Sequence, residues 1–201
     1  MKILVAICFI LGAAFVLLWN GTHIPVATVV SGTTSKPETV GGVQIGGHFS
    51  LVDQTGKVVT EKSWPGKFKL VFFGFTHCPD ICPVTLQKIS VVLEKLGAKA
   101  GRVQVLFVTV DPARDTPKAM EEYVANFSKS IIGLTGTEKQ IKSIEDAYKV
   151  YAAKQPVNGE GDYDVDHSAY IYLMSPDDKA VEIIDDQLTA EEMAGKIKAH
   201  I

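Results

Sequence analysis

Two cysteines and the proline after the second one are the residues whose chemistry stands out in this sequence. Cys78 and Cys82 are separated by three residues and follow an apolar, strand-like run at residues 70–75. Pro83 follows Cys82 directly, and proline suits the first position of a helix while disfavouring helical geometry in the residue before it. The sequence therefore predicts that Cys82 is the N-cap of a helix opened by Pro83, with Cys78 on the loop that leads into it.

Several kinds of chemistry are open to such a pair. The positive end of a helix dipole favours thiolate over thiol, and two thiolates at a strand-to-helix turn can form a disulfide, attack one or bind a soft metal. A thioredoxin-type pair has two intervening residues, whereas this pair has three, and the wider spacing suits two sulfurs on one ion. Spacing alone leaves metal binding and redox chemistry as alternatives, next to the simpler reading of two unreactive structural cysteines.

The elements that must position the cysteines follow from hydrophobic periodicity and capping residues. They are a hairpin at 48–53 and 57–60, strands at 68–75 and 103–110, helices beginning at Pro83, Thr116-Pro117 and Thr137, strands at 168–174 and 180–184, and a last helix capped by Thr189. Strand and helix alternate, and a tight turn joins the last two strands. This order predicts an α/β fold, a thioredoxin-like sandwich with an N-terminal β-hairpin and an extra central helix. No element is predicted between residues 152 and 166.

The predicted fold brings the cysteine turn close to the loop before the late pair of strands. Thioredoxin-type oxidoreductases usually have a cis-proline in that loop, but this chain has Asp166-His167-Ser168 there. We expect His167 to be the third ligand of a metal, because two thiolates and one imidazole suit copper(I) and zinc. One of the acidic residues before it, Asp162, Asp164 or Asp166, is a candidate acceptor for the other ring N–H, and a solvated acidic loop is the alternative explanation for each of them.

Other polar residues near the cysteines have simpler explanations. His77 precedes Cys78, and adjacent side chains of an extended segment point to opposite faces, so His77 is expected to point away from the metal. Asp80 lies between the cysteines, where a turn role is expected. Asp111 and residues 114–117 follow the second predicted strand, and either turn and cap chemistry or a partner surface explains them.

The composition argues against two functional classes. The chain has 201 residues and a formal net charge of −3, which speaks against nucleic-acid binding. Its third cysteine, Cys8, lies in an apolar N-terminal stretch, so a scaffold of structural disulfides is excluded as well.

The N-terminal stretch predicts a membrane anchor. Residues 3–19 carry no charge, and their number meets the lower edge of the range for a membrane-spanning helix. No clean signal-peptidase site follows them. We expect an uncleaved transmembrane anchor at residues 1–20, a linker rich in Gly, Ser, Thr and Pro at residues 21–44, and a thioredoxin-like domain at residues 45–201. Lys2 before the stretch, with no Lys or Arg after it until Lys36, predicts that the N-terminus lies inside. Because no Arg- and Ser-rich amphipathic leader precedes the stretch, we expect a bacterial inner membrane with the domain in the periplasm, and a mitochondrial inner membrane facing the intermembrane space is the alternative.

Three motifs of the chain resemble those of the Sco/SenC family. They are GFTHCPDICP at residues 74–83, VDPARDTP at residues 110–117 and DVDHS at residues 164–168. The resemblance covers roughly residues 45–200, and the cysteine motif together with the downstream Asp-His-Ser is its specific part. The family comprises membrane-anchored, thioredoxin-like copper proteins of cytochrome c oxidase assembly.

The resemblance implies that Cys78, Cys82 and His167 bind copper. We expect the two thiolates and the imidazole to hold copper(I), and copper(II) with an added ligand that the sequence does not identify is a second state. The resemblance also implies a metallochaperone that delivers copper to the CuA site of cytochrome c oxidase subunit II, or reduces the cysteines of that site, and that receives copper from a donor protein. The residues alone leave an enzyme as the alternative, a thiol–disulfide or peroxide reductase that uses Cys78 and Cys82 without a metal.

Overall fold

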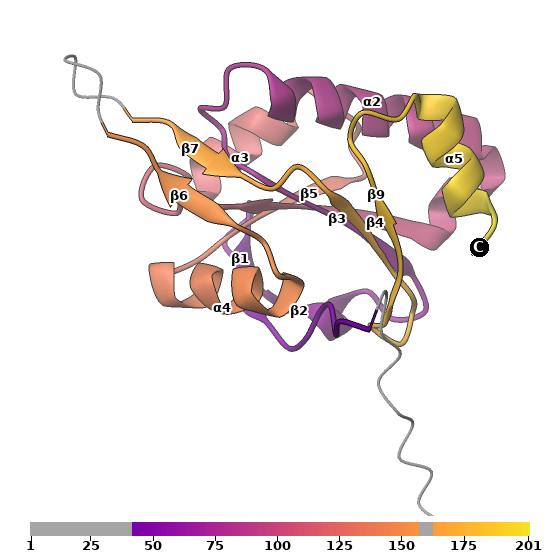
Figure 1. Ribbon diagram of the computed structural model, residues 1–201, viewed down its shortest axis with the longest axis horizontal. Coiled ribbons are helices and arrows are strands. Elements are labelled where there is room, and N and C mark those ends of the chain that lie inside the picture. Colours follow the sequence, from indigo (N-terminus) through magenta and orange to yellow (C-terminus); the bar gives the residue numbers. More distant parts are fainter. Residues whose placement is uncertain (1–41, 157–162) are drawn as a thin grey trace, which may run out of the picture. The chain divides into compact units, whose positions relative to one another are not determined.

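A seven-stranded mixed sheet forms the centre of the structure (Figure 1), a computed structural model that describes residues 42–156 and 163–201. Its strands are β1 (Ser50–Asp53), β2 (Val58–Thr60), β3 (Phe68–Gly74), β4 (Val103–Thr109), β5 (Ile131–Thr135), β8 (Ile171–Met174) and β9 (Ala180–Ile184). The strand order is β2-β1-β5-β4-β3-β8-β9. Strands β3, β4 and β5 are parallel to one another, and the outer pairings are antiparallel.

Helices cover both faces of this sheet. They are α2 (Ile81–Leu96), α3 (Pro117–Val124), α4 (Glu138–Tyr148) and α5 (Ala190–Lys198), with short 3-10 turns at Glu61–Ser63 and Gly97–Arg102. In Figure 1, α2 and α5 lie together on one face and α4 lies on the other. The predicted capping boxes at Thr137 and Thr189 are both formed, and Thr116 caps α3 ahead of Pro117.

Strands β3 and β4 are the longest buried strands of the sheet. Every residue of β3 and β4 is buried, as expected of parallel strands covered on both faces. The strands pair in register from Phe68 opposite Val103 to Gly74 opposite Thr109. The cysteine turn therefore begins at the carboxyl end of β3, beside the end of β4. The architecture is the expected thioredoxin-like α/β fold, with the predicted N-terminal hairpin formed by β1 and β2.

Strand β5 was not expected from the sequence. It lies between β4 and β1, so the chain between β4 and β8 contains a strand as well as the predicted helices. Glycine usually weakens a strand, and Gly133 occupies the middle of β5. There, an added Cβ would lie 3.1 Å from the Met120 Cε of α3 and 3.2 Å from Val124 Cγ1. The close approach of α3 therefore explains why glycine occupies position 133, and this glycine made the strand hard to recognise from the sequence.

The expectation of no regular element between residues 152 and 166 is wrong. Strands β6 (Ala152–Lys154) and β7 (Val165–His167) form a separate two-stranded antiparallel sheet, with Ala152 opposite His167. We call this sheet the β6–β7 hairpin; it is drawn in orange at the left of Figure 1. His167 is consequently carried by a short hairpin and not by a strand of the main sheet.

The predicted anchor at residues 1–20 lies outside the described residues, as does the predicted linker up to residue 41. Within the described part of the chain, no helix combines the length and apolar character that crossing a membrane requires. The proposed domain boundaries stay predictions.

Candidate metal centre

The structure brings the three predicted ligands together, although they come from three different elements. Cys78 lies on the loop after β3, Cys82 in the first turn of α2, and His167 at the end of β7. Their sulfur and nitrogen atoms all lie within 4.8 Å of one another, and His167 Nε2 is 3.5 Å from Cys82 Sγ. Sulfurs bound to one ion lie up to about twice a ~2.3 Å bond apart. The donor set and its spacing therefore fit one thiophilic ion.

Helix α2 begins two residues earlier than the sequence indicated. It starts at Ile81 with Asp80 as N-cap, so the prediction that Cys82 is the N-cap and Pro83 opens the helix is wrong. The first four N–H groups of a helix have no intrahelical partner, so a proline is tolerated anywhere in the first turn. The backbone N–H of Cys82 is one of these groups, and it donates to Cys78 Sγ at 3.4 Å.

The two cysteines have different surroundings. Cys82 is fully buried, and its sulfur lies where a Cβ on Gly74 would be only 2.7 Å away. Cys78 is partly exposed and lines a pocket of about 470 Å³ together with His167, Ile81 and Tyr151. An incoming molecule therefore meets Cys78 and the imidazole first and Cys82 behind them.

The close contact between the sulfurs separates their acidities. The hydrogen bond from Cys82, assisted by His167, lowers the pKa of Cys78 to about 4 against the opposing effect of burial. The same hydrogen bond and the burial of Cys82 raise the pKa of the Cys82 thiol. The metal-free pair therefore holds one thiolate, on Cys78, and one proton, on Cys82. Binding of a metal by both sulfurs would release that proton.

We expect iodoacetamide to alkylate Cys78 of the reduced full chain at a rate nearly constant from neutral pH downward and half-maximal near pH 4, because the thiolate persists above the pKa of about 4. Cys82 should stay unmodified over the same range. Peptide mass spectrometry after timed quenching measures both rates, with a cysteine-containing peptide as the control. A rate that falls steadily below pH 8, as for an ordinary thiol, would contradict the assignment.

The orientation of the His167 ring is fixed by a backbone group. Its Nδ1 lies 3.0 Å from the carbonyl oxygen of Ser168, and a carbonyl can only accept, so Nδ1 carries the proton. In the neutral ring, Nε2 then presents its lone pair toward the sulfurs. In the protonated ring, Nε2 donates to Cys78, and although burial opposes the charge, this hydrogen bond raises the pKa of His167. The sequence pointed to an acidic residue for this role. Instead, Asp164 accepts from the N–H of Val165, Asp166 accepts from Gln155, and Asp162 lies outside the described residues.

The remaining candidates near the cysteines lie outside the cluster. His77, as expected, has a side chain that is 48% exposed, and its Nδ1 lies 3.0 Å from Thr76 Oγ1. Asp80 makes no side-chain capping bond and lines the pocket. Asp111 begins a turn, as one of the two expectations had it, because its carbonyl accepts from the N–H groups of Arg114 and Asp115. The side chains of Asp111 and Asp115 are fully buried, so they do not form a partner surface.

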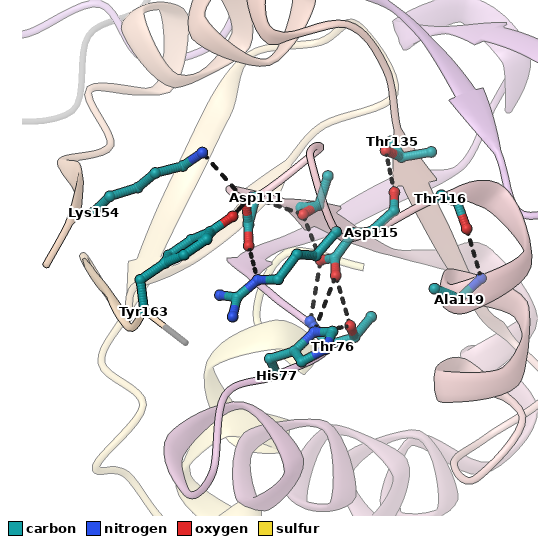
Figure 2. Close-up of polar contacts among 11 residues, drawn as sticks. Thr76, His77, Asp111, Asp115, Thr116, Ala119, Thr135, Lys154 and Tyr163 are labelled. Atoms are coloured by element: carbon teal, nitrogen blue, oxygen red, sulfur yellow. Dashed lines mark hydrogen bonds and ion pairs between the residues drawn. The ribbon is translucent and has the colours of Figure 1, made fainter. Parts of the chain in front are cut away.

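Asp115 fixes the loop that carries Cys78. It accepts hydrogen bonds from the Thr76 N–H at 3.1 Å, the Thr76 hydroxyl at 2.6 Å and the Thr109 hydroxyl at 2.6 Å (Figure 2). Burial raises the pKa of Asp115 in spite of these bonds. The motif at residues 110–117 drew attention to this carboxylate, but its burial and partners could not be read from the sequence.

The sequence of this chain is similar to that of a known protein family. The family model described as SCO1/SenC matches residues 37–201. Protein sco1 of Schizosaccharomyces pombe is 43% identical over 166 residues, which cover 81% of this chain and 63% of that protein. The chain thus spans about three fifths of the length of the first curated relatives it matches, between 56% and 63%.

Solved structures agree with the observed fold. The structure of ScoI from Bradyrhizobium japonicum with copper bound is 46% identical and superimposes with a TM-score of 0.72, over 78% of this chain and 99% of that one. The structure of yeast Sco1 with copper bound is 42% identical with a TM-score of 0.73, over 79% of this chain and 88% of that one.

Proposed function

Because the chain belongs to the SCO1/SenC family, we propose that it is a copper metallochaperone serving assembly of the CuA site of cytochrome c oxidase subunit II. The observation that carries the proposal is the convergence of Cys78, Cys82 and His167. Relatives of similar sequence were solved with copper bound, which supports copper as the cargo. A copper donor protein and subunit II are the proposed partners.

The geometry suits a carrier that must release its ion. Copper(I) prefers soft ligands and accepts low coordination numbers, so two sulfurs and one nitrogen suffice to hold it. We infer that the ligands of a client displace Cys78 and His167 first, because these two line the pocket, and the buried Cys82 last. The exposed side chains of Ile81 and Tyr151, at the same pocket, offer apolar surface for the client.

An N-terminal anchor is also part of the proposal. The uncharged stretch at residues 3–19 would hold the copper-binding domain at a membrane, in the bacterial periplasm or the mitochondrial intermembrane space. Tethering would raise the effective concentration of the domain toward a client in the same membrane.

Thiol–disulfide exchange is the second candidate function, and the acidity of Cys78 favours it. A partly exposed thiolate with a pKa of about 4 can attack a disulfide of the client, and Cys82 can then resolve the mixed disulfide. The products are the reduced client and a Cys78–Cys82 disulfide. Both functions would use the same two sulfurs.

Anaerobic titration of the reduced full chain with copper(I) tests the proposed function. We expect one copper per chain and an X-ray absorption spectrum with two sulfur ligands and one nitrogen ligand. Protein whose Cys78 has been alkylated is the control and should not bind copper stoichiometrically. Absence of stoichiometric binding by the reduced chain would refute the metallochaperone and leave the thiol–disulfide exchanger.

A further inference from the structure

We propose that three residues, Tyr163, Asp111 and Arg114, position the imidazole of His167 opposite the cysteines; we call them the hairpin latch. The proposal rests on the proposed copper function, since it assigns positioning residues to that site. Its starting point is the weakness of the β6–β7 hairpin, whose two strands have three residues each. An isolated two-stranded hairpin is marginally stable in water, so contacts with the rest of the fold must hold it in place.

The carboxylate of Asp111 is the centre of the latch. It is fully buried, and it accepts from the Tyr163 hydroxyl at 2.7 Å and from the Arg114 Nε at 2.5 Å. The Lys154 ammonium lies 3.6 Å from the same carboxylate. Figure 2 shows Lys154 and Tyr163 both reaching toward Asp111. Because Lys154 ends β6 and Tyr163 lies two residues before β7, both strands of the hairpin are tied to one carboxylate.

The guanidinium of Arg114 extends the latch to the ligand itself. Its central carbon lies 3.8 Å from the ring centroid of Tyr163 and 5.7 Å from that of Phe75. The Phe75 ring in turn contacts the His167 ring edge-on, with 6.0 Å between their centroids. Arg114 therefore lies between an aromatic residue of the hairpin and an aromatic residue of the cysteine loop. A planar guanidinium stacks well on such faces, which a lysine does less well.

The Tyr163–Asp111 hydrogen bond of the latch lies on the imidazole side of the site. Asp115 lies four residues after Asp111 in the same loop, but its side chain accepts hydrogen bonds from Thr76 of the cysteine loop and Thr109 of β4. Two buried carboxylates of one loop thus hold the two arms of the site separately. Loss of the latch should therefore move His167 while leaving the thiol pair in place.

Tyr163→Phe tests the latch, because it removes only the hydroxyl that donates to Asp111. We expect the copper(I) dissociation constant of the reduced full chain, measured by competition with a chromogenic chelator, to rise about tenfold, as for other outer-shell partners. In the metal-free protein, hydrogen exchange of the hairpin amides should become faster. Tyr170→Phe is the matched control: Tyr170 is half-exposed, lies three residues after His167, and should leave both measurements unchanged.

The same substitution in a His167→Ala background separates positioning from general damage. If Tyr163 acts through the imidazole, the tenfold loss should vanish there, and the alkylation rate of Cys78 at neutral pH should be unaffected by Tyr163→Phe in either background. A loss that persists without His167, or faster hairpin exchange with unchanged copper affinity, overturns the proposal. If the wild-type chain binds no copper, the proposed function fails, and hydrogen exchange in metal-free Tyr163→Phe still decides whether the latch holds the hairpin.

Discussion

Replacing His167 with alanine is expected to weaken copper(I) binding by more than about 100-fold, because the loss of a direct ligand exceeds the 10–100-fold loss typical of an outer-shell partner. The imidazole is the only nitrogen donor of the Cys78, Cys82 and His167 cluster. The affinity for copper(II) should fall still further, because copper(II) favours nitrogen ligands over sulfur ligands more than copper(I) does. Competition titrations of both oxidation states, under anaerobic and aerobic conditions, measure these losses.

The thiol chemistry of the same variant should survive. His167 makes only a secondary contribution to the low pKa of Cys78, behind the hydrogen bond from Cys82. Alkylation of Cys78 should therefore remain fast at neutral pH, with its midpoint moved upward from about 4. His77→Ala is the matched control, since it removes an exposed imidazole directly beside Cys78 and should bind copper like the wild type. Equal losses in the two variants would exclude His167 as the third ligand.

Gly74→Ala should disturb the buried sulfur without removing any ligand. Its added Cβ would lie 2.7 Å from Cys82 Sγ and 2.8 Å from the Phe107 ring, distances at which something must shift. Overpacking of this kind typically costs about 1–3 kcal/mol of stability. We expect urea unfolding of the metal-free chain to report a loss of that size. Copper(I) affinity should also fall at least tenfold, because the added methyl group would displace the fully buried sulfur of Cys82.

Gly195→Ala provides the comparison for this variant. An added Cβ at Gly195 meets no atom within 4 Å, and alanine is favoured over glycine inside a helix by roughly 0.8–1 kcal/mol. That variant should be slightly more stable and bind copper normally. If Gly74→Ala unfolds at the wild-type urea concentration and retains full copper affinity, the packing around Cys82 is looser than described.

Local sequence patterns predicted most of the elements around the site. The continuous apolar runs that became β3 and β4 and the capping boxes of α4 and α5 act over a few residues, so the sequence shows them directly. Strand β5 and the β6–β7 hairpin were missed because strands of three to five residues are stabilised by pairing and packing partners outside their own short segments. Gly133 is required by a helix packed against it, and β6 pairs with β7 from across the segment between Gln155 and Asp164.

The sequence by itself determined which ligands are available: two cysteines at a strand-to-helix turn and a histidine 85 residues after the second one, where the predicted topology returns to the same end of the sheet. The types of these three side chains and their positions relative to the predicted strands and helices were sufficient to identify them as candidate ligands. Their convergence was an expectation, and the atoms that meet became known only from the structure.

Only the tertiary structure decided how these residues differ from one another. It buries Cys82 and leaves Cys78 accessible, directs the Nδ1 proton of His167 to a backbone carbonyl, and buries Asp111 and Asp115 in one loop. Two cysteines, or two aspartates, a few residues apart look equivalent in a sequence. Burial and hydrogen-bond partners depend on the packing of distant segments, and these set the pKa values of the thiols and the position of the imidazole.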